Sequence, residues 1–154
     1  MHAETPFSTA PARGVIDGDT HHYPLRVYYE DTDAGGIVYY ANYLKFAERA
    51  RTEMMHLLGA GYAESISSGE IAFAVRRCEV DYLAPARLGD ILEVHTTMAQ
   101  TRGASMNGHQ VVYRSDEELV RLEVELVCLN RDGRPARIPD NLRNVLQSLT
   151  SPST

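Results

Sequence analysis

The chain is organised around residues 26–43, which read RVYYEDTDAGGIVYYANY. This stretch joins an extended aromatic segment to a turn with two aspartates and two glycines, and then to the start of a helix. Glycine tolerates the left-handed backbone of tight turns, so Gly35 and Gly36 predict that the extended segment ends there. The turn would bring the carboxylate of Asp33 to the positively polarised first turn of a helix.

An amphipathic helix is predicted directly after this turn, over residues 41–58. Apolar side chains recur at steps of three and four residues, and charged side chains fill the remaining positions. The apolar positions are Tyr43, Phe46, Ala47, Ala50, Met54, Leu57 and Leu58. A helix of this length spans ~27 Å, and a strand of about eight residues spans ~26 Å. We therefore expect the helix to lie across a sheet and bury its apolar stripe there.

Five strands are predicted, one before the helix and four after it. Their ranges are 23–29, 71–82, 91–99, 105–113 and 120–128. The last shows the sharpest alternation of apolar and charged residues. Four strands in succession favour a meander, and a short closing helix is predicted at 139–149. The fold class is α+β, with five antiparallel strands wrapped around one long helix. Such a sheet has an unpaired edge, which a dimer joined edge to edge would cover.

Length and composition indicate a single domain. The 154 residues are 44% hydrophobic and 23% charged, which is enough for one buried core. We predict a flexible tail at residues 1–21, one domain at 22–147 and a second flexible tail at 148–154. No apolar run approaches the roughly 18 residues of a membrane span, and the N-terminus lacks the pattern of a secretory signal. A cytosolic protein that does not span a membrane is expected.

Charge and residue types argue against several partners. The net charge of -6 disfavours nucleic acid, whose phosphates attract basic proteins. Cys78 and Cys128 lie in apolar or alternating runs and are predicted to be reduced core residues. The pair His21 and His22 is too isolated to indicate a metal site. Three other histidines also lack a partner at metal-ligand spacing, namely His56, His95 and His109.

Three kinds of chemistry could use the aspartate and glycine turn. A calcium loop starting at Asp31 requires glutamate at its twelfth position, where this chain has Asn42. A phosphatase with an aspartyl nucleophile requires a Mg²⁺ cage built from further acidic residues and alternating βα units, and neither of these patterns is evident after residue 60. Thioester hydrolysis requires only a nucleophile or base and hydrogen-bond donors for the carbonyl oxygen.

The turn could meet the requirements of thioester hydrolysis. Asp33 supplies a nucleophile or a general base, and the unpaired N–H groups near Tyr40, where the helix begins, supply the donors. The residue types do not distinguish direct attack by Asp33 from activation of a water molecule. On residue types alone, a turn in which the aspartates only cap the backbone is the more frequent outcome.

The turn and the following helix also resemble a known family. The run YYEDTDAGGIVY at residues 28–39, together with Ala41, Tyr43 and ERARTE at 48–53, is similar to the Tol-Pal-associated acyl-CoA thioesterases. These belong to the 4-hydroxybenzoyl-CoA thioesterase branch of the hotdog superfamily. The similarity continues through residues 75–76, 81–90 and 102–105, and thus covers about residues 23–139. The resemblance implies a hotdog fold and hydrolysis of acyl-CoA, with coenzyme A as part of the substrate and no cofactor or metal.

The resemblance further implies roles for individual residues. Asp33 corresponds to the catalytic aspartate, and the backbone N–H of Tyr40 corresponds to the group that polarises the thioester carbonyl. Contacts with the substrate or with coenzyme A are expected from Gly36, Val38, Arg76, Arg102 and Ser105. Arg76 is a weaker candidate than Arg102 and Ser105, as are Arg87 and Arg137, and for each arginine a solvated or ion-paired surface role is the more frequent outcome. The family forms homodimers through sheet edges, often assembled as homotetramers, with active sites between subunits.

The residue at position 40 bears on the substrate. The Tol-Pal-associated enzymes typically carry histidine there, whereas the 4-hydroxybenzoyl-CoA enzymes carry tyrosine, as this chain does. A backbone donor is unaffected by that exchange, so short aliphatic and aromatic acyl groups both stay open as substrates. The alternative function is a noncatalytic module of the same fold that binds acyl thioesters or acyl carrier protein.

Overall fold

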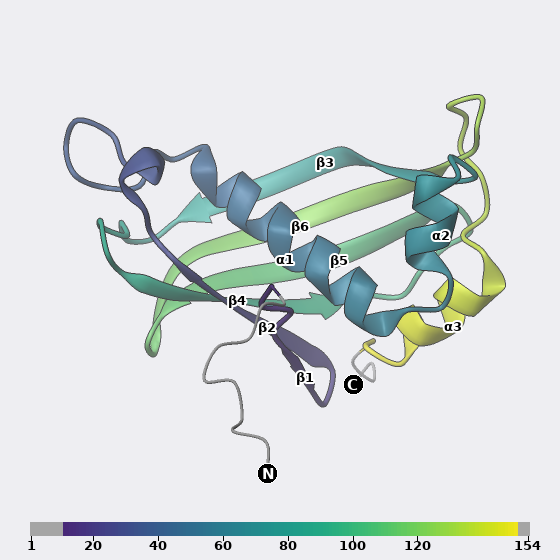
Figure 1. The fold of residues 1–154 in the computed structure, drawn as a ribbon, viewed down its shortest axis with the longest axis horizontal. Coiled ribbons are helices and arrows are strands. Elements are labelled where there is room, and N and C mark those ends of the chain that lie inside the picture. The colour runs from purple at the N-terminus through teal and green to yellow at the C-terminus, as the bar shows by residue number, and fades with distance from the viewer. Residues whose placement is uncertain (1–10, 151–154) are drawn as a thin grey trace, which may run out of the picture.

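One antiparallel sheet crossed by a long helix forms the protein, as described by a computed structural model for residues 11–150 (Figure 1). The strands are β1 (Val15–Asp17), β2 (Thr20–Arg26), β3 (Ala72–Tyr82), β4 (Ile91–Met98), β5 (Ser105–Arg114) and β6 (Glu117–Leu129). The helices are the 3₁₀ turn η1 (Tyr29–Asp31), α1 (Asn42–Leu58), α2 (Tyr62–Ser67) and α3 (Asp140–Gln147). The expected α+β class and the long helix across the sheet are confirmed.

The order of the strands differs from the predicted meander. The sheet runs β1-β2-β4-β5-β6-β3, so of the four strands after α1 only β4, β5 and β6 follow one another as neighbours. The connection at residues 83–90 explains the difference, because it crosses the sheet rather than turning back. At its start, the N–H of Ala84 donates to the carbonyl of Leu119. At its end, the N–H of Gly89 donates to the carbonyl of Val27, next to β2. As a result β3 lies at one edge beside β6, and β4 pairs with β2.

Structured residues lie inside both segments that the sequence predicts as tails. The strand β1 lies inside the predicted N-terminal tail, because the turn at Gly18, with φ of +62°, folds β1 onto β2 as a hairpin. The predicted count of five strands is therefore one too few. At the other end, Leu149 is buried and Thr150 forms a bridge with Met98. The remainder of the two predicted tails, residues 1–10 and 151–154, lies outside the described part of the chain.

The core has two parts that share helix α1. One surrounds the N-terminal half of the helix, where Phe46 packs against residues of β4 and β6 such as Leu92 and Leu122. The other surrounds the C-terminal half, where Met54 and Met55 pack among residues from the far ends of the strands and from α3. The buried positions of the helix are Tyr43, Phe46, Ala47, Ala50, Met54 and Met55. The predicted stripe is thus largely confirmed, although Leu57 is exposed.

Strand β3 is an edge strand with a largely exposed surface. Only one of its sides is paired, and most of its residues are exposed or half-buried. Cys78, on this strand, is therefore exposed, which corrects its prediction as a core residue, whereas Cys128 on β6 is buried as predicted. Among the described residues no helix is both long enough and apolar enough to cross a membrane.

Candidate active site

The glycine turn forms a small hairpin that ends at the start of α1. Thr32 and Val38 form an antiparallel bridge, and the N–H of Asp33 donates to the carbonyl of Ile37 at 2.9 Å. Between them, the N–H of Gly36 donates to the carbonyl of Asp33 at 3.0 Å, and Gly36 has a φ of +78°. This left-handed backbone favours glycine. The hairpin reverses the chain, so Asp33 and the residues that lead into α1 both lie next to the bridge between Thr32 and Val38.

The side chain of Asp33 is held by the turn and exposed to solvent. Its Oδ1 accepts a hydrogen bond from the N–H of Gly35 at 2.8 Å. A Cβ atom on Gly35 would lie only 3.2 Å from that same oxygen, which explains why glycine suits this position. Across the described residues, no side chain or backbone group donates to Oδ2 of Asp33. The turn thus orients the carboxylate and leaves one oxygen open.

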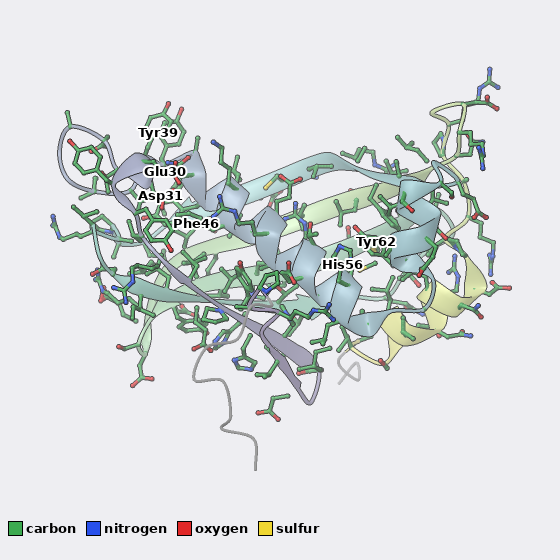
Figure 2. All side chains as sticks on the ribbon, viewed as in Figure 1. Glu30, Asp31, Tyr39, Phe46, His56 and Tyr62 are labelled. Carbon is green, nitrogen blue, oxygen red and sulfur yellow. The ribbon has the colours of Figure 1, made fainter. Side chains whose placement is uncertain are left out.

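The neighbouring Asp31 has a different, structural role. It is buried, and its Oδ2 accepts the N–H of Tyr28 at 2.8 Å. Its carbonyl accepts both the N–H of Tyr39 at 2.9 Å and the side-chain amide of Asn42 at 2.8 Å. Figure 2 shows Asp31 next to Tyr39 at the start of α1. Asp31 therefore ties the glycine turn to the helix, while Asp33 carries the available carboxylate.

The helix begins without a side-chain cap. Ala41 is the N-cap residue, and its side chain makes no capping hydrogen bond. Within residues 11–150, the backbone N–H of Tyr40 has no acceptor at hydrogen-bond distance. The carbonyl of Tyr40 is engaged, because it accepts the hydroxyl of Tyr82 at 3.0 Å. The residue just before the N-cap of α1 therefore presents a free donor next to the positively polarised end of the helix.

A cavity of about 330 Å³ lies beside the helix start. It is lined by Ile37, Val38, Tyr40, Tyr43, Tyr82, Leu83, Ala84 and Pro85. The ring of Tyr82 stands edge-on to that of Tyr40, with the centroids 6.0 Å apart, and 5.8 Å from that of Tyr43. The Tyr43 hydroxyl accepts the N–H of Ala86 at 2.9 Å, and burial raises its pKa. The cavity is thus largely apolar and aromatic.

The predicted site residues fall into separate regions of this chain. Gly36 and Val38 lie in the same hairpin as Asp33, and Val38 is buried with its N–H bonded to Ala86. The weaker candidate Arg87 also lies here, because it forms a bridge with Ile37. The structure therefore groups Asp33, Gly36, Val38 and Tyr40, with Arg87 beside them.

Arg76 occupies the irregular point of β3, where its register with β6 shifts between Val75 and Arg77. Its guanidinium is paired with Glu125. The other weak candidate, Arg137, lies 3.8 Å from Asp140 at the start of α3.

Arg102 and Ser105 form a turn at the opposite end of α1 from Asp33. Their backbones exchange two hydrogen bonds of 2.8 Å, and the enclosed Gly103 accepts the N–H of Ile138, just before α3. The next residue, Met106, belongs to the part of the core around the C-terminal half of α1. A single chain therefore does not bring this turn to Asp33.

Tyr82 was not predicted as a site residue, although it contacts both the cavity and the carbonyl of Tyr40. The sequence places it at the end of a strand, where an aromatic residue is commonplace. Its position next to the helix start depends on β3 lying at the edge beside β6, which the predicted meander did not contain.

Comparison with known proteins decides the family. A family model described as the thioesterase superfamily matches residues 35–121, which is more than half of the chain. The chain belongs to the thioesterase superfamily. The match includes the glycine turn from Gly35 onward, the helices α1 and α2, the strands β3, β4 and β5, and the first residues of β6.

Two acyl-CoA thioesterases and one solved thioesterase structure resemble the chain. Acyl-CoA thioester hydrolase YbgC of Escherichia coli O6:H1 is 44% identical over 122 residues, which are 78% of this chain and 90% of that protein. Acyl-CoA thioesterase YbgC of Haemophilus influenzae is 36% identical over 128 residues, covering 82% and 94%. The crystal structure of a probable thioesterase from Bartonella henselae superposes with a TM-score of 0.72 at 32% identity, covering 78% and 99%. The expected hotdog thioesterase fold is therefore confirmed, with six strands rather than five.

Proposed function

We propose that this thioesterase hydrolyses acyl-CoA to a free acid and coenzyme A, with Asp33 as its reacting group. The observation that carries the proposal is the pairing of an oriented carboxylate with a free donor. Asp33 keeps one oxygen open while Gly35 holds the other, and the same hairpin leads to the free N–H of Tyr40. The names of the relatives in Escherichia coli and Haemophilus influenzae support the same substrate class.

The N–H of Tyr40 and the carboxylate of Asp33 have separate roles in the reaction. The N–H of Tyr40 donates to the thioester carbonyl, whose oxygen gains negative charge as the carbon is attacked. One such donor typically lowers the barrier by ~3 kcal/mol, and the dipole of α1 adds to its effect. Asp33 either attacks the carbonyl carbon, forming an anhydride that water then cleaves, or removes a proton from the attacking water. The thiolate of coenzyme A leaves without requiring an acid.

The acyl group occupies the cavity beside the helix start. Its volume of about 330 Å³ and its lining of Tyr40, Tyr43 and Tyr82 suit a compact acyl group, either aromatic or short aliphatic. Aromatic rings pack favourably edge-on to other rings, and the rings of Tyr40 and Tyr82 already stand in that arrangement. Val38 forms part of the wall, and Gly36 leaves the mouth of the turn without a side chain.

A panel of acyl-CoA substrates tests the function. We expect hydrolysis of benzoyl-type or short aliphatic acyl-CoA, and slower turnover of long-chain acyl-CoA, whose chains exceed the cavity. Release of free thiol is measured with a thiol-reactive dye for each substrate. A protein that binds acyl-CoA or acyl carrier protein but hydrolyses none of the thioesters would instead be a noncatalytic binding module. That result would overturn the proposal.

The unpaired edge of β3 is the proposed contact between subunits. A long exposed edge strand readily pairs with another strand, and β3 exposes apolar side chains such as Val75 at 51% and Tyr82 at 47%. Two copies joined there form a homodimer, with further assembly into a homotetramer. Tyr82 would then lie at the contact, so that the partner helps to enclose the active site. Arg76, Arg102 and Ser105 are assigned to coenzyme A binding across this contact, because they lie away from Asp33 within one chain.

Cys78 provides a test of this contact. It lies near the middle of β3, so the two copies of this residue come close when two β3 strands pair antiparallel about a two-fold axis. We expect a short bis-maleimide reagent to link two chains in high yield, as seen by denaturing electrophoresis. The Cys78→Ser protein is the control, because the buried Cys128 should not react. A monomer in analytical ultracentrifugation, with no linked product, would contradict the β3 contact.

A further inference from the structure

Two histidines and a glutamate meet on the strands β2 and β4. His22 and His95 are direct cross-strand partners, and Glu93 lies two positions before His95 on the same face of β4. The Nδ1 of His22 lies 3.1 Å from the Nε2 of His95. The Oε1 of Glu93 lies 3.0 Å from the Nδ1 of His22 and 2.8 Å from the Nε2 of His95. Three potential metal ligands therefore converge at one point.

Hydrogen bonds alone do not satisfy this triangle of atoms. A ring nitrogen of histidine either carries a hydrogen or offers a lone pair, and a carboxylate oxygen only accepts. If both nitrogens carry hydrogens, both donate to Glu93 and two donors face each other across 3.1 Å. If one nitrogen lacks a hydrogen, its lone pair faces the oxygen of Glu93. With Glu93 ionised, every arrangement of hydrogens on the two histidines thus leaves at least one repulsive contact, whereas a cation at the centre attracts all three atoms.

We propose that His22, Glu93 and His95 form a binding site for a divalent first-row transition metal ion, with Zn²⁺ as the reference ion. Zinc lies ~2.0–2.1 Å from a histidine nitrogen, so ligands at right angles are ~2.9 Å apart and tetrahedral ligands ~3.4 Å apart. The three measured separations of 2.8, 3.0 and 3.1 Å lie in or near this range. Two imidazoles and one carboxylate are a ligand set that favours zinc and its neighbours over calcium or magnesium.

The surroundings of the cluster suit a site with open coordination positions. Leu92 and Val94 on β4 are buried against the core, so the alternating Glu93 and His95 lie on the other face of the strand. The side chains of His22 and His95 are each 27% exposed and that of Glu93 is 49% exposed. Water can therefore complete the coordination.

Two further features bear on the cluster. The ring of Tyr113 packs against that of His95, with the centroids 4.4 Å apart, and limits its rotation. A cavity of about 270 Å³ adjoins His22 and Glu93 and extends to the β1 hairpin at Gly14 and Val15. The bound ion would link β2 to β4 next to this cavity.

The site is independent of the proposed hydrolysis. None of its three ligands belongs to the glycine turn or to the lining of the cavity at Tyr40. It differs from the sequence-based expectation that the histidines have no metal partner. His22 and His95 lie 73 positions apart, a spacing that indicates nothing until the register of β2 and β4 is known.

Titration of the untagged, metal-free protein with Zn²⁺ tests the site, with isothermal calorimetry as the readout. His2 lies outside the described residues and is changed to alanine in every protein, so that it adds no ligand. We expect one Zn²⁺ per chain, and visible absorption from Co²⁺ in the same site. The variants His22→Asn, Glu93→Gln and His95→Gln keep hydrogen-bonding side chains of similar size. Each should weaken Zn²⁺ binding ~100-fold or more, beyond the effect of losing a group that only orients a ligand.

The matched control is His109→Asn. His109 pairs with Glu123 on neighbouring strands but has no second histidine beside it, so its loss should leave Zn²⁺ binding unchanged. Circular dichroism confirms that each variant is folded. Absence of Zn²⁺ binding, or binding equal in all three ligand variants and the control, would overturn the site. Because calorimetry does not depend on turnover, either result is separate from the outcome of the acyl-CoA panel.

Discussion

Replacing Asp33 with asparagine should lower kcat for acyl-CoA hydrolysis by about 10²–10⁴-fold, the usual contribution of a positioned acid or base. Asparagine has the same shape, and its side-chain oxygen can still accept the N–H of Gly35. An amide is neither a useful nucleophile nor a base, so the chemical step is lost while the turn persists. Steady-state kinetics give kcat, and calorimetry with a nonhydrolysable acyl-CoA analogue should show nearly unchanged binding.

Glu30 provides the matched control for Asp33. It is an exposed carboxylate in η1, three positions before Asp33. Unlike Asp33, it does not belong to the glycine turn. Glu30→Gln should keep kcat within about twofold, because surface changes away from a site rarely matter. Equal kcat losses in both variants would point to a general electrostatic effect, and an unchanged kcat for Asp33→Asn would remove Asp33 from the mechanism.

The two chemical roles of Asp33 can be separated by isotope labelling. In a single turnover in ¹⁸O-water, an anhydride intermediate that water cleaves at the Asp33 carbonyl leaves one ¹⁸O in that side chain. A general base leaves the label only in the released acid. Mass spectrometry of the peptide containing Asp33 distinguishes these outcomes. Label in Asp33 would establish covalent attack. Label in the acid alone would exclude only an anhydride that water cleaves at the Asp33 carbonyl, because cleavage at the acyl carbon also labels the acid.

Replacing Gln110 with leucine should lower the free energy of unfolding by about 2–4 kcal/mol, because it removes hydrogen bonds to buried and charged groups. Gln110 is fully buried on β5 and donates to the carbonyl of Ala47 at 2.9 Å and to the hydroxyl of Thr96 at 3.0 Å. Its Oε1 accepts from the guanidinium of Arg51 at 2.9 Å, and burial lowers the pKa of Arg51. The residue thereby joins α1 to β4 and β5. Urea denaturation followed by circular dichroism measures the change.

Asn107→Leu is the matched control for Gln110→Leu. Asn107 also carries an amide on β5, but it is exposed on the other face, so the loss should stay below about 0.5 kcal/mol. The double variant Gln110→Leu with Arg51→Met also removes the guanidinium of Arg51, so that this group is not left without its hydrogen-bond acceptor. The double variant should therefore be less destabilised than the sum of the single variants. Simple additivity would show that Arg51 does not depend on Gln110.

Local sequence patterns predicted most of the elements but not their neighbours. The helix from about residue 41 to 58 was clear because its apolar residues repeat with the helical period, and Gly59 ends it in the structure with a φ of +71°. The bounds of β4, β5 and β6 were predicted to within a few residues. The hairpin strand β1 and the six-residue α2 were missed, because segments this short show no period that stands out.

The sequence by itself determined the long helix, most of the strands and a turn that joins Asp33 to a helix start, because these depend on residues close together in the chain. Tertiary structure alone decided that β3 lies at the edge, that Tyr82 reaches Tyr40, and that Asp31 is buried while Asp33 is open. It also brought together His22, Glu93 and His95. The physical reason is that strand pairing and register depend on the packing of the whole core, so contacts between distant residues leave no local pattern.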